Sequence, residues 1–176
     1  MTRKLSRTFP KGHIREGQPT HFVEKFLNVF EVPYWEKCYM DTVRELNPGK
    51  PISLLYDFWN NLNGDAPHTD QYFGTKKHTI RLGNSIKDGQ MLQLAVWSGK
   101  PYASPEIKIW EPIACAAQNI EILKKDYLQP VIKLSETVLH NSDLAKNDGL
   151  LPKDFYSWFE KAEGLAQIIH WTDLRY

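Results

Sequence analysis

The spacing of apolar residues changes near the middle of this chain, and that change limits the fold more than any other sequence feature. Over residues 20–63, apolar side chains recur about every three to four positions, as they do on amphipathic helices. From residue 77 onward they alternate with polar side chains, which is typical of strands with one buried face. A helical pattern returns over residues 142–164. The sequence therefore predicts an α+β protein in which helices precede and follow a set of antiparallel strands.

Turn residues divide the chain into the expected elements. Thr20 is placed to cap a first helix, and Pro51 and Gly64 stand at the two ends of a third. Helices are expected over residues 21–30, 31–48, 51–64, 142–149 and 152–164, and strands over residues 77–82, 91–97, 105–110, 113–123, 129–139 and 166–176. Several antiparallel strands with helices packed outside them predict a small β-barrel.

Composition is that of an ordinary globular protein. The chain has 176 residues, enough for one domain with a filled core, and a formal net charge of +1. That charge excludes a protein that attracts nucleic acid over its whole surface, so any such contact must be local. Cys38 and Cys115 are the only cysteines, and we expect free thiols in a reducing, cytoplasmic setting. No apolar run is long enough to cross a membrane, so no membrane partner is expected.

The first 19 residues are expected to form an extended arm with turns, and they carry a basic cluster. The basic residues that precede the first acidic one, Glu16, are Arg3, Lys4, Arg7, Lys11 and Arg15. Such a cluster more often indicates a frayed, solvated terminus, and an arm that binds phosphate is the alternative.

The segment GTKKHTIRLG, residues 74–83, concentrates the candidate functional groups. Thr79 and Arg81 lie two apart in an expected strand and therefore share a face, with Lys76 at the entrance of the strand. The three side chains can thus converge on one pocket. Alternatively, the lysine belongs to a solvated turn and the threonine to a strand with one exposed face. His78 is expected on the other side of the strand, in or near the core.

Gly74-x-Lys76-x-x-Thr79-x-Arg81, together with its surroundings, resembles the ASCH domains, which are relatives of the PUA RNA-binding fold. The expected helix at 21–27, the strand at 91–99, the helix near 147–159 and the closing strand at 168–174 follow the order seen in such domains. The resemblance covers residues 20–30 and 74–176. It implies a single domain over 1–176, with an N-terminal arm (1–19), a helical insertion (31–73), and a PUA-like barrel with C-terminal helices (74–176).

The resemblance also implies a function, namely a cleft that binds a nucleotide or a single-stranded RNA segment. In such a cleft cationic groups contact phosphate or base edges, and aromatic rings stack on bases. The candidate ligand-binding residues are Gly74, Lys76, Lys77, Thr79, Arg81, Trp97 and Tyr102.

Hydrolysis is the alternative function that the resemblance implies, because some small bacterial ASCH proteins remove acetyl groups from acetylated cytidine nucleosides. There the lysine and threonine of the motif, here Lys76 and Thr79, act with a glutamate from a later helix. The nearest counterpart of that glutamate is Asp148, with Glu136 a poorer one. A hydroxyl needs a base to become a nucleophile, and a lysine can be that base where desolvation or nearby cations lower its pKa.

No metal ion or cofactor is expected. The histidine spacings are not those of a zinc site, and no P-loop, G-x-S-x-G or G-x-G-x-x-G motif occurs. A protein-interaction module that does not bind nucleic acid is the third hypothesis, since the aromatic residues of the 31–73 segment could cover a partner.

Overall fold

The computed structural model describes residues 1–32, 37–63, 74–123 and 129–176. Within these ranges the helices are α1 (Phe22–Val29), α2 (Lys37–Leu46), α3 (Ile52–Asn63), α4 (Asn141–Asn147) and α5 (Pro152–Phe159). The strands are β1 (Thr2–Lys4), β2 (His78–Leu82), β3 (Met91–Trp97), β4 (Glu106–Lys108), β5 (Ile113–Ala114), β6 (Ala116–Leu123), β7 (Val131–Leu134), β8 (Thr137–Val138) and β9 (Gly164–His170). Each helix and strand predicted from the periodicity has a counterpart, and the α+β class is confirmed.

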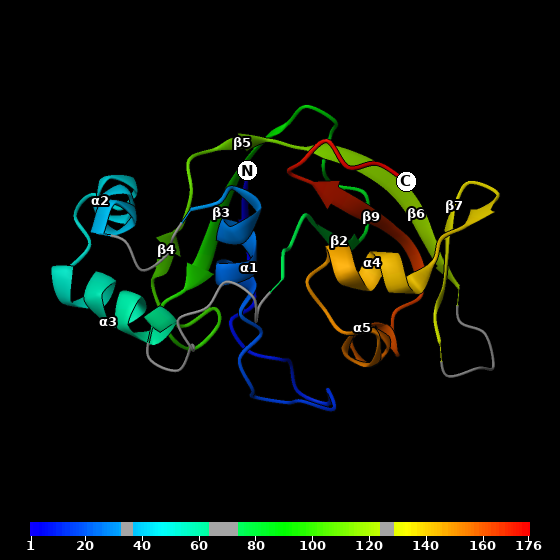
Figure 1. The fold of residues 1–176 in the computed structure, drawn as a ribbon, viewed down its shortest axis with the longest axis horizontal. Helices are drawn as coiled ribbons and strands as arrows, with labels where there is room; N and C mark the ends of the chain where they lie inside the picture. The colour runs from blue at the N-terminus through cyan, green and yellow to red at the C-terminus, as the bar shows by residue number, and fades with distance from the viewer. Residues whose placement is uncertain (33–36, 64–73, 124–128) are drawn as a thin grey trace.

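The described strands form two mostly antiparallel sheets (Figure 1). One has the order β1-β3-β4, with β5 also paired to β3, and the other has the order β2-β9-β6-β7-β8. The pairing of β1 with β3 is parallel, and the other pairings are antiparallel. In the second sheet His78 lies opposite His170 and Arg81 opposite Gln167.

The predicted closed barrel is absent from the part of the chain that the structure describes. A barrel requires every strand to be paired on both sides, whereas β2 and β8 are the edges of the five-stranded sheet and β4 is an edge of the other. The 113–123 run, which was expected to be one strand, passes from one sheet to the other. Its first part, β5, pairs with β3, and its second part, β6, pairs with β9. The run therefore joins the two sheets, while β2, β8 and β4 remain edge strands.

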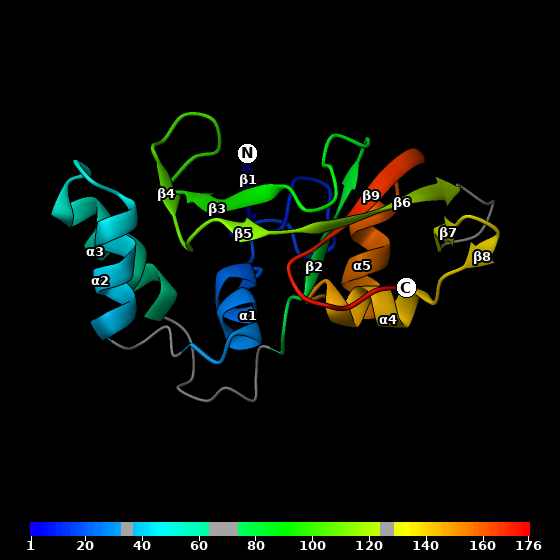
Figure 2. The same cartoon turned by 90° about the horizontal axis from the view of Figure 1, so that it is seen from above.

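The helices lie in three groups along the molecule (Figures 1 and 2). The pair α2 and α3 lies beside β4, α1 lies in the middle, and the pair α4 and α5 lies against the five-stranded sheet. Asn47, just after α2, connects the α2–α3 pair to strand β4 through two hydrogen bonds. Its side-chain amide donates to the Lys108 carbonyl (2.9 Å), and its carbonyl accepts from the Lys108 N–H (2.9 Å).

The basic N-terminal arm is built into the fold, so the expectation of a frayed terminus is wrong. β1 pairs with β3, and the next residues carry Leu5 and Phe9, which are 2% and 3% exposed. Farther along, Thr20 does not occupy the cap position of α1, because His21 does so with φ 55°. The Thr20 hydroxyl donates to the Ser6 carbonyl (2.5 Å) and accepts from the Phe22 N–H (3.3 Å), so it still serves one N–H of the first turn of α1. The arm is thereby held at both its strand and its end.

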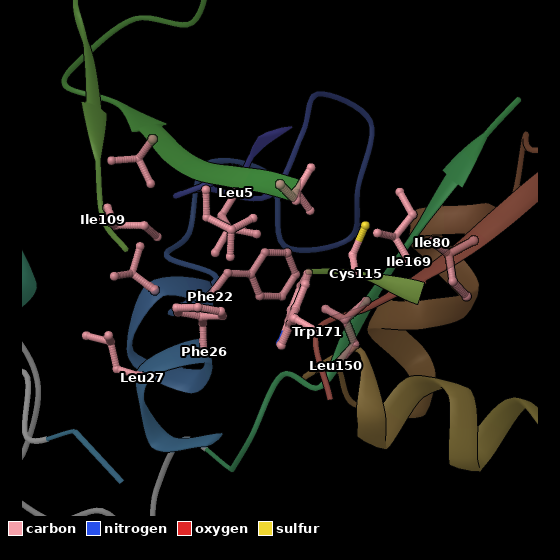
Figure 3. Packing of buried hydrophobic residues seen from close by; sticks show 14 of the residues in the cluster. Leu5, Phe22, Phe26, Leu27, Ile80, Ile109, Cys115, Leu150, Ile169 and Trp171 are labelled. Atoms are coloured by element: carbon pink, nitrogen blue, oxygen red, sulfur yellow. The ribbon is translucent and has the colours of Figure 1, made fainter. Parts of the chain in front are cut away.

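One continuous apolar core joins the arm, both sheets and the helices. Figure 3 shows Phe22 and Phe26 projecting from α1 into this core, where Leu5 of the arm and Trp171 after β9 also lie. The rings of Phe26 and Trp171 meet edge to face, with centroids 5.5 Å apart. Among the described residues, no helix combines the length and the apolar character needed to cross a membrane.

Candidate functional site

A cavity of about 700 Å³ opens between the N-terminal arm, the first turn of α1, strand β2 and the turn after β3. This volume lies in the range of small-molecule binding sites. The lining includes the 2–8 segment of the arm, Phe22 and Glu24 of α1, Arg81 of β2, and Trp97 and Tyr102 near the 97–102 turn. The cavity thus joins the first 24 residues, which include the arm and the start of α1, with Arg81 and with the 97–102 turn.

Three arginines line this cavity, Arg3, Arg7 and Arg81, together with Lys4 and the carboxylate of Glu24. Arg81 donates from Nη2 to the Lys4 carbonyl (2.9 Å), and Arg3 donates from Nη2 to the Ser85 hydroxyl (2.5 Å). Burial lowers the pKa of Arg7 from its ordinary value, although the charge of Glu24 opposes this. None of the three forms an ion pair with a carboxylate of the described residues.

The aromatic part of the lining comes from Trp97, at the end of β3, and Tyr102 in the following turn. Their ring centroids are 5.5 Å apart and the planes are tilted by 51°. Tyr102 is 91% exposed, so most of its ring is open to solvent, and its backbone takes φ 61°. Lys4 lies over the Trp97 ring, with Nζ 5.1 Å from the centroid, and pairs with Glu106 (2.5 Å). An aromatic surface is therefore available beside the cationic groups.

Strand β2 carries the last two residues of the motif, Thr79 and Arg81, as their spacing predicts. Thr79 and Arg81 lie opposite Ile169 and Gln167 of β9, so the two motif residues share a face of the sheet. Thr79 is 5% exposed and does not line the cavity, whereas Arg81, nearer the end of the strand, reaches it.

Lys76 lies buried behind the cavity wall, in contact with the carboxylate predicted for it. Its side chain is 1% exposed, and its ammonium donates to Oδ1 of Asp148 and to the Asp148 carbonyl (2.8 Å). Asp148 ends α4 and is itself 3% exposed. The Lys76 Nζ also lies 3.9 Å from the centroid of the Phe22 ring, and Phe22 lines the cavity. One aromatic ring thus separates the ion pair from the space where a ligand could bind.

Burial controls the protonation of this pair. Desolvation lowers the pKa of Lys76 and raises the pKa of Asp148, and in each case the charge of the partner opposes the shift. A second lysine, Lys25 of α1, donates to the carbonyls of Thr20 (2.8 Å) and Gly149 (2.7 Å). Burial, followed by the nearby Lys76 charge, lowers the pKa of Lys25 to about 8. Two amines with lowered pKa values therefore stand near one buried carboxylate.

His78 faces the other side of β2, as expected from its position. It is fully buried, and its ring meets His170 and Tyr176 with centroids 5.4 and 5.6 Å away. Burial lowers the pKa of His78 well below its ordinary value and that of His170 to about 4. Across the part of the chain that the structure describes, no three histidine, cysteine or acidic side chains group as metal ligands would.

The predicted ligand-binding residues fall into two groups. Arg81, Trp97 and Tyr102 line the cavity, while Gly74, Lys76, Lys77 and Thr79 do not. Gly74 takes φ +65°, and its carbonyl accepts from the Asn28 amide (3.0 Å). The Lys77 N–H donates to the Asn147 carbonyl (2.7 Å) at the end of α4. Glu136, the poorer carboxylate candidate, lies exposed in the turn between β7 and β8.

Sequence reasoning did not place Arg3, Arg7 and Phe22 at the site. For the arginines a signal existed, since they belong to the basic cluster that precedes Glu16. For Phe22 none did, because an apolar residue at helical spacing predicts only a core position.

No protein-family model, no curated protein and no solved structure matches this chain. The resemblance to ASCH domains therefore depends on the motif and on the order of the elements, and it stays a hypothesis.

Proposed function

We propose that the protein recognises a nucleotide or a short single-stranded RNA segment in the cavity between the arm, α1 and the turn after β3. The observation that carries this proposal is the combination of arginines that form no ion pair among the described residues with an aromatic pair, the half-buried Trp97 and the exposed Tyr102, around one space. Arginine binds phosphate through charge-assisted hydrogen bonds, and base stacking on an aromatic ring contributes about 1–3 kcal/mol per base. Kinship with the PUA-like ASCH domains belongs to the same proposal and is supported by the motif on β2.

Binding of a nucleotide panel and of a short single-stranded RNA, measured by calorimetry, tests the proposal. Tyr102→Ala should weaken binding about 5- to 100-fold through the lost stacking, and because the side chain is 91% exposed, the fold should persist. Arg81→Ala should weaken binding as well. Arg175→Ala, which removes an exposed arginine at the end of the chain that does not line the cavity, is the matched control. Equal binding by the Tyr102, Arg81 and control variants would refute this use of the cavity.

Removal of acetyl from acetylated cytidine nucleosides is the second candidate, and the contact between Lys76 and Asp148 favours it. In that reaction the Thr79 hydroxyl attacks the acetyl carbon, and neutral Lys76 accepts its proton. The exocyclic amine leaves with that proton, and water then releases acetate from the acetylated threonine. Burial lowers the pKa of Lys76, which increases its neutral fraction.

Acetate release by the wild type beside Lys76→Ala and Thr79→Ala separates the two candidates. Turnover that both substitutions abolish in folded protein would establish the hydrolase. Absence of turnover at micromolar enzyme, with nucleotide binding retained, would leave recognition as the function.

A further inference from the structure

Arg3 and Arg81 share an unusual property among the groups around the cavity. The Nε of each is buried and has no hydrogen-bond partner. Buried N–H groups are nearly always satisfied, so these two donors mark arginines whose hydrogen bonds within the protein are incomplete. Both residues line the same cavity.

Both guanidinium groups are held in place by neutral acceptors. Arg81 is anchored by a main-chain carbonyl of the arm, and Arg3 by the hydroxyl of Ser85. Each anchor uses one end of the planar fork and leaves other N–H groups for an incoming ligand. Their orientation is therefore fixed without neutralisation of their charge.

No carboxylate of the described residues forms an ion pair with either guanidinium group. Burial lowers the pKa of Arg81, and the positive charge of Arg3 lies near enough to lower it further. The carboxylate that acts in the opposite direction on Arg81 is Asp148, whose oxygen already accepts from Lys76. Arg7 adds a third cation to the same lining, also without an ion pair among the described residues. A dianion placed between Arg3 and Arg81 would relieve their repulsion and accept hydrogen bonds from the guanidinium N–H groups that the two anchors leave free.

We propose that Arg3 and Arg81 form a subsite for a phosphomonoester, with the attached nucleoside reaching toward Tyr102. This inference rests on the proposed function, since it names the part of the ligand that the arm binds. A phosphomonoester is favoured over an internal phosphodiester, because it carries close to two negative charges and presents three free oxygens. The source is either a free nucleotide or the phosphorylated 5′ end of an RNA.

Calorimetry with cytidine, cytidine 5′-monophosphate, and a tetranucleotide with or without a 5′ phosphate tests the subsite and its source. The monophosphate should bind at least 10-fold more tightly than the nucleoside. Arg3→Gln should reduce monophosphate affinity about 10- to 100-fold, the value of one or two charge-assisted hydrogen bonds, and leave nucleoside affinity unchanged. Lys11→Gln is the matched control, because it removes one positive charge from an exposed position of the same arm that does not line the cavity.

Inorganic phosphate provides a test that needs no base. At constant ionic strength, phosphate should raise the melting temperature of the wild type and of the Lys11 variant, and not that of the Arg3 variant. Equal affinity for nucleoside and monophosphate, or equal behaviour of the Arg3 and Lys11 variants, would overturn the subsite and leave base recognition standing. Stabilisation by phosphate through Arg3 without binding of any nucleoside, nucleotide or RNA would keep the anion site and refute the proposed function. No response to any of these ligands would refute both.

Discussion

Asp148→Asn is the substitution whose effect follows most directly from the structure. It keeps the size of the side chain but removes the only carboxylate that pairs with Lys76 among the described residues. The ammonium would retain the Asp148 carbonyl at 2.8 Å and the face of Phe22 at 3.9 Å. Neither acceptor carries a full charge. A lysine that is 1% exposed would therefore be left with an uncompensated positive charge.

The expected loss of unfolding free energy is about 3–5 kcal/mol at pH 7, as for other buried pairs from which one partner is removed. The loss has an upper limit, because the lysine can release its proton. Deprotonating a lysine of pKa about 10.4 at pH 7 costs about 4.6 kcal/mol, and at pH 9 only about 1.9 kcal/mol. The cost of the substitution should thus fall as pH rises. The direction of this pH dependence agrees with proton linkage: the unfolded variant binds the proton that the folded variant has lost, so its unfolding free energy rises with pH.

Denaturant unfolding of wild type and variant at pH 6, 7, 8 and 9 measures this effect. Asp143→Asn, on the exposed first turn of α4, is the control and should stay within about 0.5 kcal/mol of the wild type at every pH. A loss below about 1 kcal/mol for Asp148→Asn at pH 7, or a loss that does not decline toward pH 9, would refute the account of the buried ammonium.

Three further substitutions test other parts of the site. Gly149→Ala should lower the free energy of unfolding by about 1–3 kcal/mol, because φ is +73° and the added Cβ would lie 3.2 Å from Cβ of Lys76. Gly89→Ala has the same φ but open space around the added Cβ, so it should cost only about 1 kcal/mol when denaturant unfolding compares the two. Trp171→Phe should cost about 1–3 kcal/mol in the same assay, because its indole N–H donates to the Lys76 carbonyl (2.7 Å), which would be left unsatisfied. His170 stays neutral in the folded protein (pKa about 4) but is protonated in the unfolded chain below pH 6.5. Through this residue the wild type should lose at most about 3 kcal/mol of unfolding free energy between pH 6.5 and 4. His170→Gln should flatten that part of the profile of unfolding free energy against pH, and an unchanged slope would contradict the role given to His170.

The elements of this fold could be predicted from the sequence, whereas the pairing of the strands could not. Periodicity is a local property, so the helices on either side of the strands were found correctly. The division of the 113–123 run between two sheets depends on which distant strands pair with it. The alternation of apolar and polar residues would be the same if the run paired with one sheet or with two. β1 was missed for another reason: Thr2–Lys4 contains no apolar residue, and its place in a sheet is fixed by pairing with β3 and by the burial of Leu5 just after it.

At the candidate site, spacing placed Thr79 and Arg81 on one face, and Asp148 was the nearest candidate for the carboxylate that would act with Lys76 and Thr79. The shared face and an ion pair between Lys76 and Asp148 are present in the structure, although the functional roles stay predictions. The hydrolase hypothesis requires desolvation of Lys76, but its neighbours in the sequence do not indicate how deeply it is buried. A lysine next to another lysine in a turn ordinarily faces water, and the group that removes it from water here, Phe22, comes from a helix about 50 residues earlier.

Phe22 also explains why one motif supports two functional hypotheses. The ring lines the cavity and at the same time covers the ammonium of Lys76, so a ligand in the cavity would contact an apolar face instead of the ion pair. Recognition needs no movement of that ring, since Arg81, Trp97 and Tyr102 already reach the cavity. Hydrolysis requires the ring to move, because the acetyl group must approach Lys76 and Thr79, which are 1% and 5% exposed. Recognition therefore needs only the arrangement present in the structure, and hydrolysis needs a second one.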